Sequence, residues 1–223
     1  MKKIIFTIIS VIVVCVAIII VNFIIVEKSS SETLRGKPIV KNNAAKKALL
    51  VIDIQEGLTG KLAANDDYVI KSDELIANIN QIADSSAGKN IPVIYVKNEI
   101  SNFLINILNS SLAKGSPGAE LDSRLKVVSN HVINKEKKDA FSNLLLDSIL
   151  IKNEVNKLVF TGLDLAYCIN STIEAAQNRN YDICLITDAV LSETNSLKNE
   201  MLNKFRQSGC EIISSKEYLE RIN

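Results

Sequence analysis

Three reactive side chains in this sequence each follow an apolar run of the kind that forms a buried β-strand. They are Asp53, Lys135 and Cys168. Parallel strands end along one edge of a sheet, where ligands bind, so we expect the three side chains to meet there. Helix N-H groups near Cys168 would favour a thiolate that attacks a carbonyl carbon. Asp53 could take the thiol proton and later activate water, with Lys135 orienting the carboxylate.

Each of these residues also has an ordinary structural interpretation. An Asp that ends a strand often caps a turn, a Lys there is usually solvated, and a Cys is usually a small buried apolar residue. Only the expected meeting of all three side chains at one edge of the sheet indicates a catalytic site. The turn at residues 162–167, just before Cys168, could aim backbone N-H groups at a developing oxyanion.

The elements that would position these residues alternate regularly from residue 48 onward. Short apolar runs are separated by segments with helical periodicity, which predicts an α/β domain with a mainly parallel six-stranded sheet and helices on both faces. The predicted strands are 48–54, 91–96, 131–134, 157–162, 182–187 and 211–214. Ser72, ahead of two acidic residues, predicts the start of the first helix. Residues 98–125 interrupt the alternation with a short helical pattern and a turn-rich loop, a length typical of a lid or binding loop.

The N-terminal segment has a different character. Residues 4–26 are almost wholly apolar and uncharged, which is long enough to cross a bilayer. We interpret residues 1–26 as an uncleaved transmembrane anchor rather than a signal peptide, because the run is long and no small-x-small cleavage site follows it. Residues 27–45 then form a linker and 46–223 the domain. Basic residues flank the run on both sides, so the side of the membrane on which the domain lies stays open.

Composition narrows the class of protein further. The chain has 223 residues, 47% hydrophobic, with a net charge of +1, which excludes a disordered chain and gives none of the basic excess of a nucleic-acid binder. Its four cysteines form neither a CxxC metal pattern nor an even disulfide framework in the domain. Cys184 and Cys210 are interpreted as core residues.

Three segments, in order and at suitable spacing, resemble the signatures of the isochorismatase-like cysteine hydrolases. They are residues 48–57 around Asp53, the Lys-x-x-x-x-Ala-Phe segment from Lys135 to Phe141, and residues 162–168, Gly-Leu-Asp-Leu-Ala-Tyr-Cys. The loop at 115–121 and the strand at 181–189 also match, so the resemblance covers about residues 46–214. Ordered agreement of this kind is more specific than any single motif.

The resemblance implies a three-layer α/β/α fold with Asp53, Lys135 and Cys168 as a catalytic triad. It also implies an oxyanion hole made by the amides of Asp164 and Cys168, with a cis peptide at Leu163-Asp164. Family members are usually oligomers, so a homo-oligomer is expected. Gln55, Phe103 and Tyr167 are candidate substrate contacts, although Gln55 and Tyr167 could equally serve packing or capping.

The presence of a single histidine narrows the range of possible substrates. Nicotinamidases of this family hold a divalent metal with several His ligands, but this chain has only His131, so we expect no metal or other cofactor. Cys168 favours hydrolysis of a small amide, carbamoyl or ureido C-N bond through a covalent thioester-type intermediate. The alternatives are hydrolysis of an isochorismate-type vinyl ether, a non-catalytic binding module that retains the fold, and a redox protein.

Overall fold

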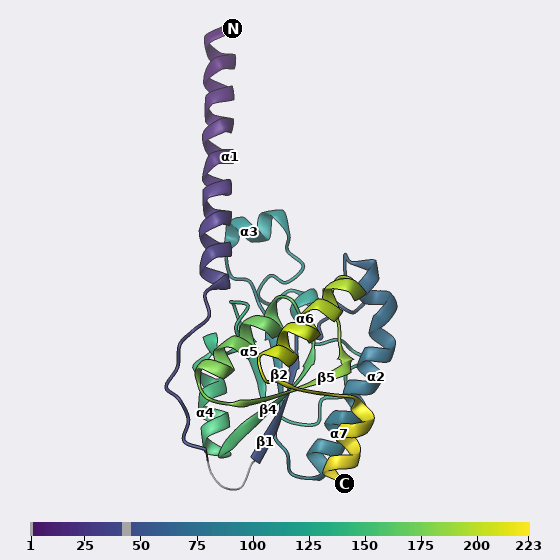
Figure 1. Ribbon diagram of the computed structural model, residues 1–223. Coiled ribbons are helices and arrows are strands. Elements are labelled where there is room, and N and C mark those ends of the chain that lie inside the picture. The colour runs from purple at the N-terminus through teal and green to yellow at the C-terminus, as the bar shows by residue number, and fades with distance from the viewer. Residues whose placement is uncertain (1, 42–45) are drawn as a thin grey trace.

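A six-stranded parallel sheet lies at the centre of this computed structural model, which describes residues 2–41 and 46–223 (Figure 1). The strand order is β3-β2-β1-β4-β5-β6, and every neighbouring pair is parallel. The strands are β1 (Lys46–Ile52), β2 (Val93–Asn98), β3 (Val132–Lys135), β4 (Val155–Gly162), β5 (Asp182–Val190) and β6 (Glu211–Ile213). All six predicted strands are therefore confirmed, with ends displaced by no more than three residues.

Helices cover both faces of the sheet, as predicted. The helices of the described residues are α1 (Lys2–Ser31), α2 (Asp66–Gly88), α3 (Phe103–Leu108), α4 (Leu144–Lys152), α5 (Cys168–Asn178), α6 (Asn195–Gln207) and α7 (Ser215–Ile222), with short 3-10 turns at Pro117–Ala119 and Ala140–Ser142. Apolar residues of α2 and α7 form one core with one face of the sheet, and those of α4, α5 and α6 form a second core with the other face. The result is the three-layer α/β/α arrangement.

The central strands explain why the sequence shows continuous apolar runs rather than alternation. In β1, Leu50 and Ile52 belong to one core, whereas Leu49 and Val51 belong to the other. A parallel strand covered by helices on both faces has no solvent side, so every position favours an apolar residue. Beyond β1 the chain moves outward to β2, and beyond β4 it moves the other way to β5. The carboxyl ends of the neighbouring strands β1 and β4 thus mark the switch point where such folds bind ligands.

Two helix boundaries differ from the sequence prediction. Helix α2 begins at Asp66, not near Ser72, because the Asn65 side chain caps it by accepting from the Asp67 amide. Ser72 is a buried residue inside the helix, and its hydroxyl donates to the carbonyl of Val69. The sequence analysis also missed α7, although its first turn carries the Ser-x-x-Glu capping box that starts at Ser214.

The N-terminal helix is longer than the apolar run. Helix α1 continues to Ser31, and none of its described residues is buried in the domain. Its length and composition are sufficient to cross a membrane. In Figure 1 it projects from the domain as one straight element beside α3.

The described part of the predicted linker is bound to the domain by hydrogen bonds. Arg179 is only 3% exposed; its guanidinium donates to the Leu34 carbonyl at 2.8 Å, and its own carbonyl accepts from the Ile39 amide at 2.8 Å. A buried guanidinium requires acceptors, and residues 32–41 supply one by running along the domain. Residues 42–45 of the predicted linker, and Met1 of the predicted anchor, lie outside the described residues.

Candidate active site

The three predicted reactive side chains lie together at the carboxyl edge of the sheet. The Nζ of Lys135 is 2.9 Å from Oδ2 of Asp53 and 3.2 Å from Sγ of Cys168. Lys135 and Asp53 are 1% and 2% exposed, whereas Cys168 is partly accessible. We refer to the three as the Asp-Lys-Cys cluster. Two fixed, buried charges beside a reachable thiol can move a proton and hold a nucleophile.

Each member of the cluster is positioned by the end of a regular element. Asp53 directly follows β1 with φ of 56°, and its amide donates to the Val96 carbonyl of β2 at 2.8 Å. Asp is among the few residue types that tolerate this left-handed backbone, which turns the chain sharply out of the strand. Lys135 is the last residue of β3, and Cys168 is the first residue of α5.

The electrostatics keep the thiol protonated at rest. Burial, together with the negative charge of Asp53, raises the pKa of Cys168 to about 12, although the Lys135 ammonium opposes this shift. Burial tends to lower the pKa of Lys135, but the charges of Asp53 and Cys168 outweigh it and hold the pKa above its usual value. Oδ1 of Asp53 is buried and has no hydrogen-bond partner among the described residues. That oxygen therefore has unused hydrogen-bond acceptor capacity within the cluster.

Among the amides of residues 164–170, those of Asp164, Cys168 and Asn170 donate no hydrogen bond within the described residues, whereas those of Leu165, Ala166, Tyr167 and Ile169 all donate. The first two are the amides that the resemblance implies for the oxyanion hole. The peptide between Leu163 and Asp164 is cis, as the resemblance implied. Free amides near a nucleophile are the donors that a tetrahedral oxyanion needs.

The Asp164 side chain, which fixes this turn, is held by groups that the sequence analysis did not identify. The hydroxyl of Tyr68 donates to Oδ2 of Asp164 at 2.6 Å, and the hydroxyl of Ser192 donates to Oδ1 at 3.0 Å. Burial and the Asp164 charge raise the pKa of Tyr68 well above its usual range, so it remains a donor. Tyr68 lies in the first turn of α2, ahead of the helix start predicted at Ser72.

We predict that Tyr68→Phe lowers kcat about tenfold with little change in KM, because the amide donors shift away from the oxyanion that forms only in the transition state. Steady-state kinetics measure this directly. Tyr95→Phe is the matched control, since Tyr95 is also a buried tyrosine whose hydroxyl donates a hydrogen bond, in its case to the Lys126 carbonyl at 2.8 Å. Both variants should lose similar thermal stability, so equal kcat values in the two would contradict a positioning role for Tyr68.

The three candidate substrate contacts have different positions. Gln55 is fully buried and its amide is saturated by backbone groups, with Nε2 donating to the Asn98 and Ala119 carbonyls and Oε1 accepting from the Asn98 amide. The structure therefore supports the packing interpretation of Gln55. Tyr167 is 41% exposed and directly precedes Cys168 in the chain. Phe103 is 74% exposed on α3 and does not line the cavity described next.

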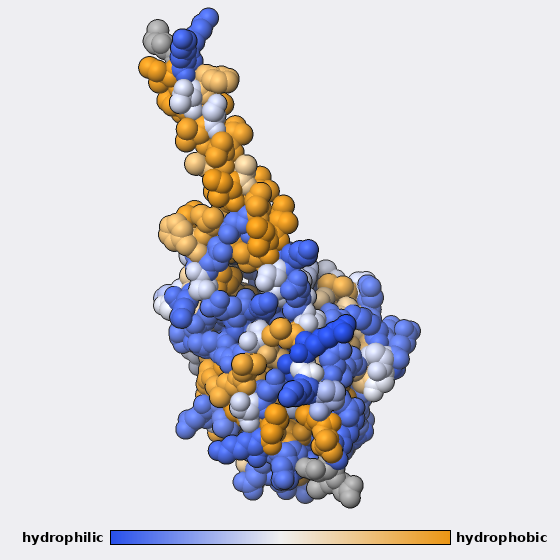
Figure 2. Space-filling model, turned by 90° about the vertical axis from the view of Figure 1, so that its left-hand side faces the viewer, coloured by the Kyte–Doolittle hydropathy of each residue, from blue (hydrophilic) through white to orange (hydrophobic). Residues whose placement is uncertain are grey.

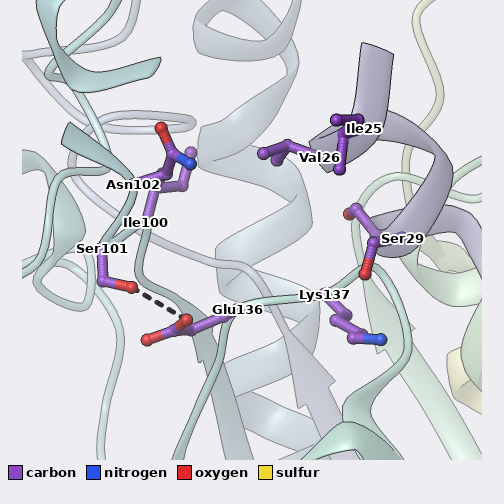
Figure 3. Close-up of a pocket in the computed structure, with 9 residues that line it drawn as sticks. Ile25, Val26, Ser29, Ile100, Ser101, Asn102, Glu136 and Lys137 are labelled. Carbon is purple, nitrogen blue, oxygen red and sulfur yellow. Dashed lines mark hydrogen bonds between the residues drawn. The ribbon is translucent and has the colours of Figure 1, made fainter. Parts of the chain in front are cut away.

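A cavity of about 340 Å³ lies between the C-terminal end of α1 and the loops that follow β2 and β3 (Figure 3). It is lined by Ile25, Val26, Ser29, Ser30, Ile100, Ser101, Asn102, Glu136 and Lys137. Ser101 donates to Glu136 at 2.9 Å across one side of it. Lys135 immediately precedes two of the lining residues, so the cavity adjoins the loop that follows Lys135.

The other domain cysteines are distant from Cys168. Cys184 is buried in the core on the opposite face of the sheet from α5. Cys210 contacts Gln177, near the far end of α5, which places it roughly 13 Å along the helix from Cys168. Both are buried, as predicted, and neither is placed to resolve an oxidised Cys168.

The fold is that of the isochorismatase-like hydrolases. A crystal structure of an isochorismatase-like hydrolase from Alkaliphilus metalliredigens aligns with a TM-score of 0.70 at 20% identity, covering 80% of this chain and 100% of that one. The chain belongs to the isochorismatase family, because the family described as Isochorismatase domain matches residues 47–217.

Two curated relatives have named activities. N-carbamoylsarcosine amidase from an Arthrobacter species is 27% identical over 46% of this chain. Ureidoacrylate amidohydrolase RutB from Acinetobacter baylyi is 29% identical over 56% of this chain. The matches span 44% of the first relative's length and 62% of the second's.

Proposed function

We propose that this chain is a membrane-anchored cysteine hydrolase that cleaves the C-N bond of a small carbamoyl, ureido or amide compound without a metal. The observation that carries the proposal is the Asp-Lys-Cys cluster, in which Lys135 contacts Asp53 and Cys168 at 2.9 and 3.2 Å. The amides of Asp164 and Cys168, which donate no hydrogen bond within the described residues, support it because they would supply oxyanion donors beside the thiol.

The cluster supports a two-stage reaction. Asp53 takes the thiol proton while Sγ of Cys168 attacks the carbonyl carbon, and the amides of Asp164 and Cys168 receive the oxyanion. The intermediate collapses to a thioester as the amine leaves with the proton held by Asp53. Asp53 then deprotonates a water that attacks the thioester, and the returning proton regenerates the thiol. Lys135 holds the carboxylate and the sulfur in place and balances their charge throughout.

The choice of a C-N bond rests on Cys168 and on the relatives. Vinyl-ether hydrolysis requires an acid and a placed water but no thiol nucleophile, whereas a thiolate is suited to acyl and carbamoyl transfer. The relatives named above are an amidase for a carbamoyl compound and an amidohydrolase for a ureido compound.

The anchoring role of α1 rests on its length and composition. At about 1.5 Å per residue, residues 4–26 extend roughly 35 Å, compared with about 30 Å for the hydrocarbon core of a bilayer. No charged residue interrupts this run, so we propose that α1 spans the membrane once.

Release of ammonia or amine from a panel of N-carbamoyl, ureido and simple amide compounds tests the activity. The purified full-length chain in detergent should turn over at least one compound of the panel, and isochorismate should not be cleaved. Cleavage of isochorismate alone would favour the vinyl-ether alternative. A chain that turns over nothing, and whose Cys168 reacts with iodoacetamide no faster than Cys184, would favour a non-catalytic module.

A further inference from the structure

Helix α3 exposes large apolar side chains on the end of the domain nearest α1. Phe103, Ile107 and Leu108 are 74%, 59% and 61% exposed, and no residue of this helix is buried. The residues that flank it, 101–102 and 109–111, are Ser and Asn and carry no charge. Clustered exposed apolar groups with an uncharged polar border mark an interaction surface.

Helix α3 contacts α1, and the half-buried face of α1 extends into its apolar run. The half-buried residues there include Ile19, Asn22, Val26 and Ser30, which recur every three or four positions and so share one face of the helix. Ile19, Asn22 and Val26 belong to the run at residues 4–26. The water or lipid that surrounds residues 19–26 of α1 therefore also contacts α3.

Contacts at the end of α1 fix its position relative to the domain. The amide of Lys138 donates to the Ser30 carbonyl at 3.1 Å, and its Nζ donates to the Ser31 hydroxyl at 2.9 Å and to Glu27 at 2.5 Å. Because Lys138 follows Lys135 by one short turn, the end of α1 is held against the loop of the candidate active site.

We propose that α3 is a second membrane contact, which lies in the interfacial layer of the bilayer that α1 spans. This inference rests on the proposed anchoring by α1. Figure 2 shows α1 as an almost unbroken apolar column above a largely hydrophilic domain, and α3 adds apolar surface beside the base of that column. A short helix with Phe, Ile and Leu outward suits the boundary between headgroups and acyl chains. The cavity bounded by Ile25 and Val26 then opens at the membrane surface.

Tryptophan fluorescence gives a direct test, because the chain contains no tryptophan and each variant carries a single reporter. The full-length variants Phe103→Trp, Phe23→Trp and Ile151→Trp are reconstituted into phosphatidylcholine vesicles with and without brominated acyl chains. Phe23 reports on α1, and Ile151 is an equally apolar, 63% exposed residue on α4, at the other end of the domain (Figure 1).

We expect brominated lipid to quench Phe103→Trp to a similar degree as Phe23→Trp, and to leave Ile151→Trp unchanged. Quenching of Phe23→Trp without quenching of Phe103→Trp would overturn the inference and leave the anchor intact. A blue-shifted but unquenched Phe103→Trp would overturn it in favour of contact with a second copy of the chain. Absence of quenching in all three variants would overturn the anchor and, with it, this inference.

Discussion

Asp53→Asn is expected to slow hydrolysis and, at the same time, to speed the alkylation of Cys168. Hydrolysis should fall about a thousandfold or more, because both the thiol and the attacking water lose their base. Alkylation of Cys168 by iodoacetamide at pH 7 should instead rise about tenfold, because the gain in thiolate outweighs the lower nucleophilicity that accompanies a lower pKa.

The reason for the faster alkylation is the charge balance of the cluster. Burial and the Asp53 carboxylate raise the pKa of the thiol, while Lys135, 3.2 Å from the sulfur, lowers it. Removing the negative charge leaves the ammonium as the only charged neighbour within the cluster. Asn also tolerates the left-handed backbone at position 53, so the turn should remain intact.

Mass spectrometry of peptides after timed alkylation measures this effect, with buried Cys184 as the internal control in the same sample. Slower alkylation of Cys168 in Asp53→Asn than in the wild type would contradict the assigned charge balance. It would indicate that Asp53 activates the resting thiol rather than holding it protonated.

Lys135→Met should abolish hydrolysis and destabilise the fold by about 3 to 5 kcal/mol, because it leaves a buried carboxylate without its partner. Methionine fills a similar volume, so the loss reflects charge rather than packing. The midpoint temperature of thermal unfolding should fall by roughly 10 °C.

The double variant Asp53→Asn/Lys135→Met is the control for this interpretation. It removes both charges, so it should recover most of the lost stability while remaining inactive. A double variant no more stable than Lys135→Met would show that Lys135 stabilises the domain through its aliphatic stem and not through its ion pair with Asp53.

The alternation of apolar runs and helical patterns was sufficient to predict the layers, the strands and the edge where Asp53, Lys135 and Cys168 meet. Parallel strands buried on both faces, such as β1, leave an unambiguous signal because every position is apolar. The cis peptide at Leu163-Asp164 came only from the resemblance, since nothing in local composition distinguishes it.

The supporting groups were harder to predict. Tyr68 reaches Asp164 across 96 positions of sequence, and no local pattern reports such a pairing. Gln55 was a candidate for either substrate contact or packing, and its amide is hydrogen-bonded by backbone groups that only the folded loops bring together. The course of residues 32–41 was missed because a polar segment without periodicity gives no sign of the buried Arg179 that it satisfies.

The covalent intermediate is the most direct test of the proposed chemistry. Full-length protein is mixed with a carbamoyl or ureido compound that it turns over, quenched in acid within the first turnover, and digested for mass spectrometry. The peptide that contains Cys168 should carry the acyl or carbamoyl part of the compound, and Cys168→Ala should show neither adduct nor turnover. Undiminished turnover by Cys168→Ala would contradict the account, because the thiol would then have no part in breaking the bond.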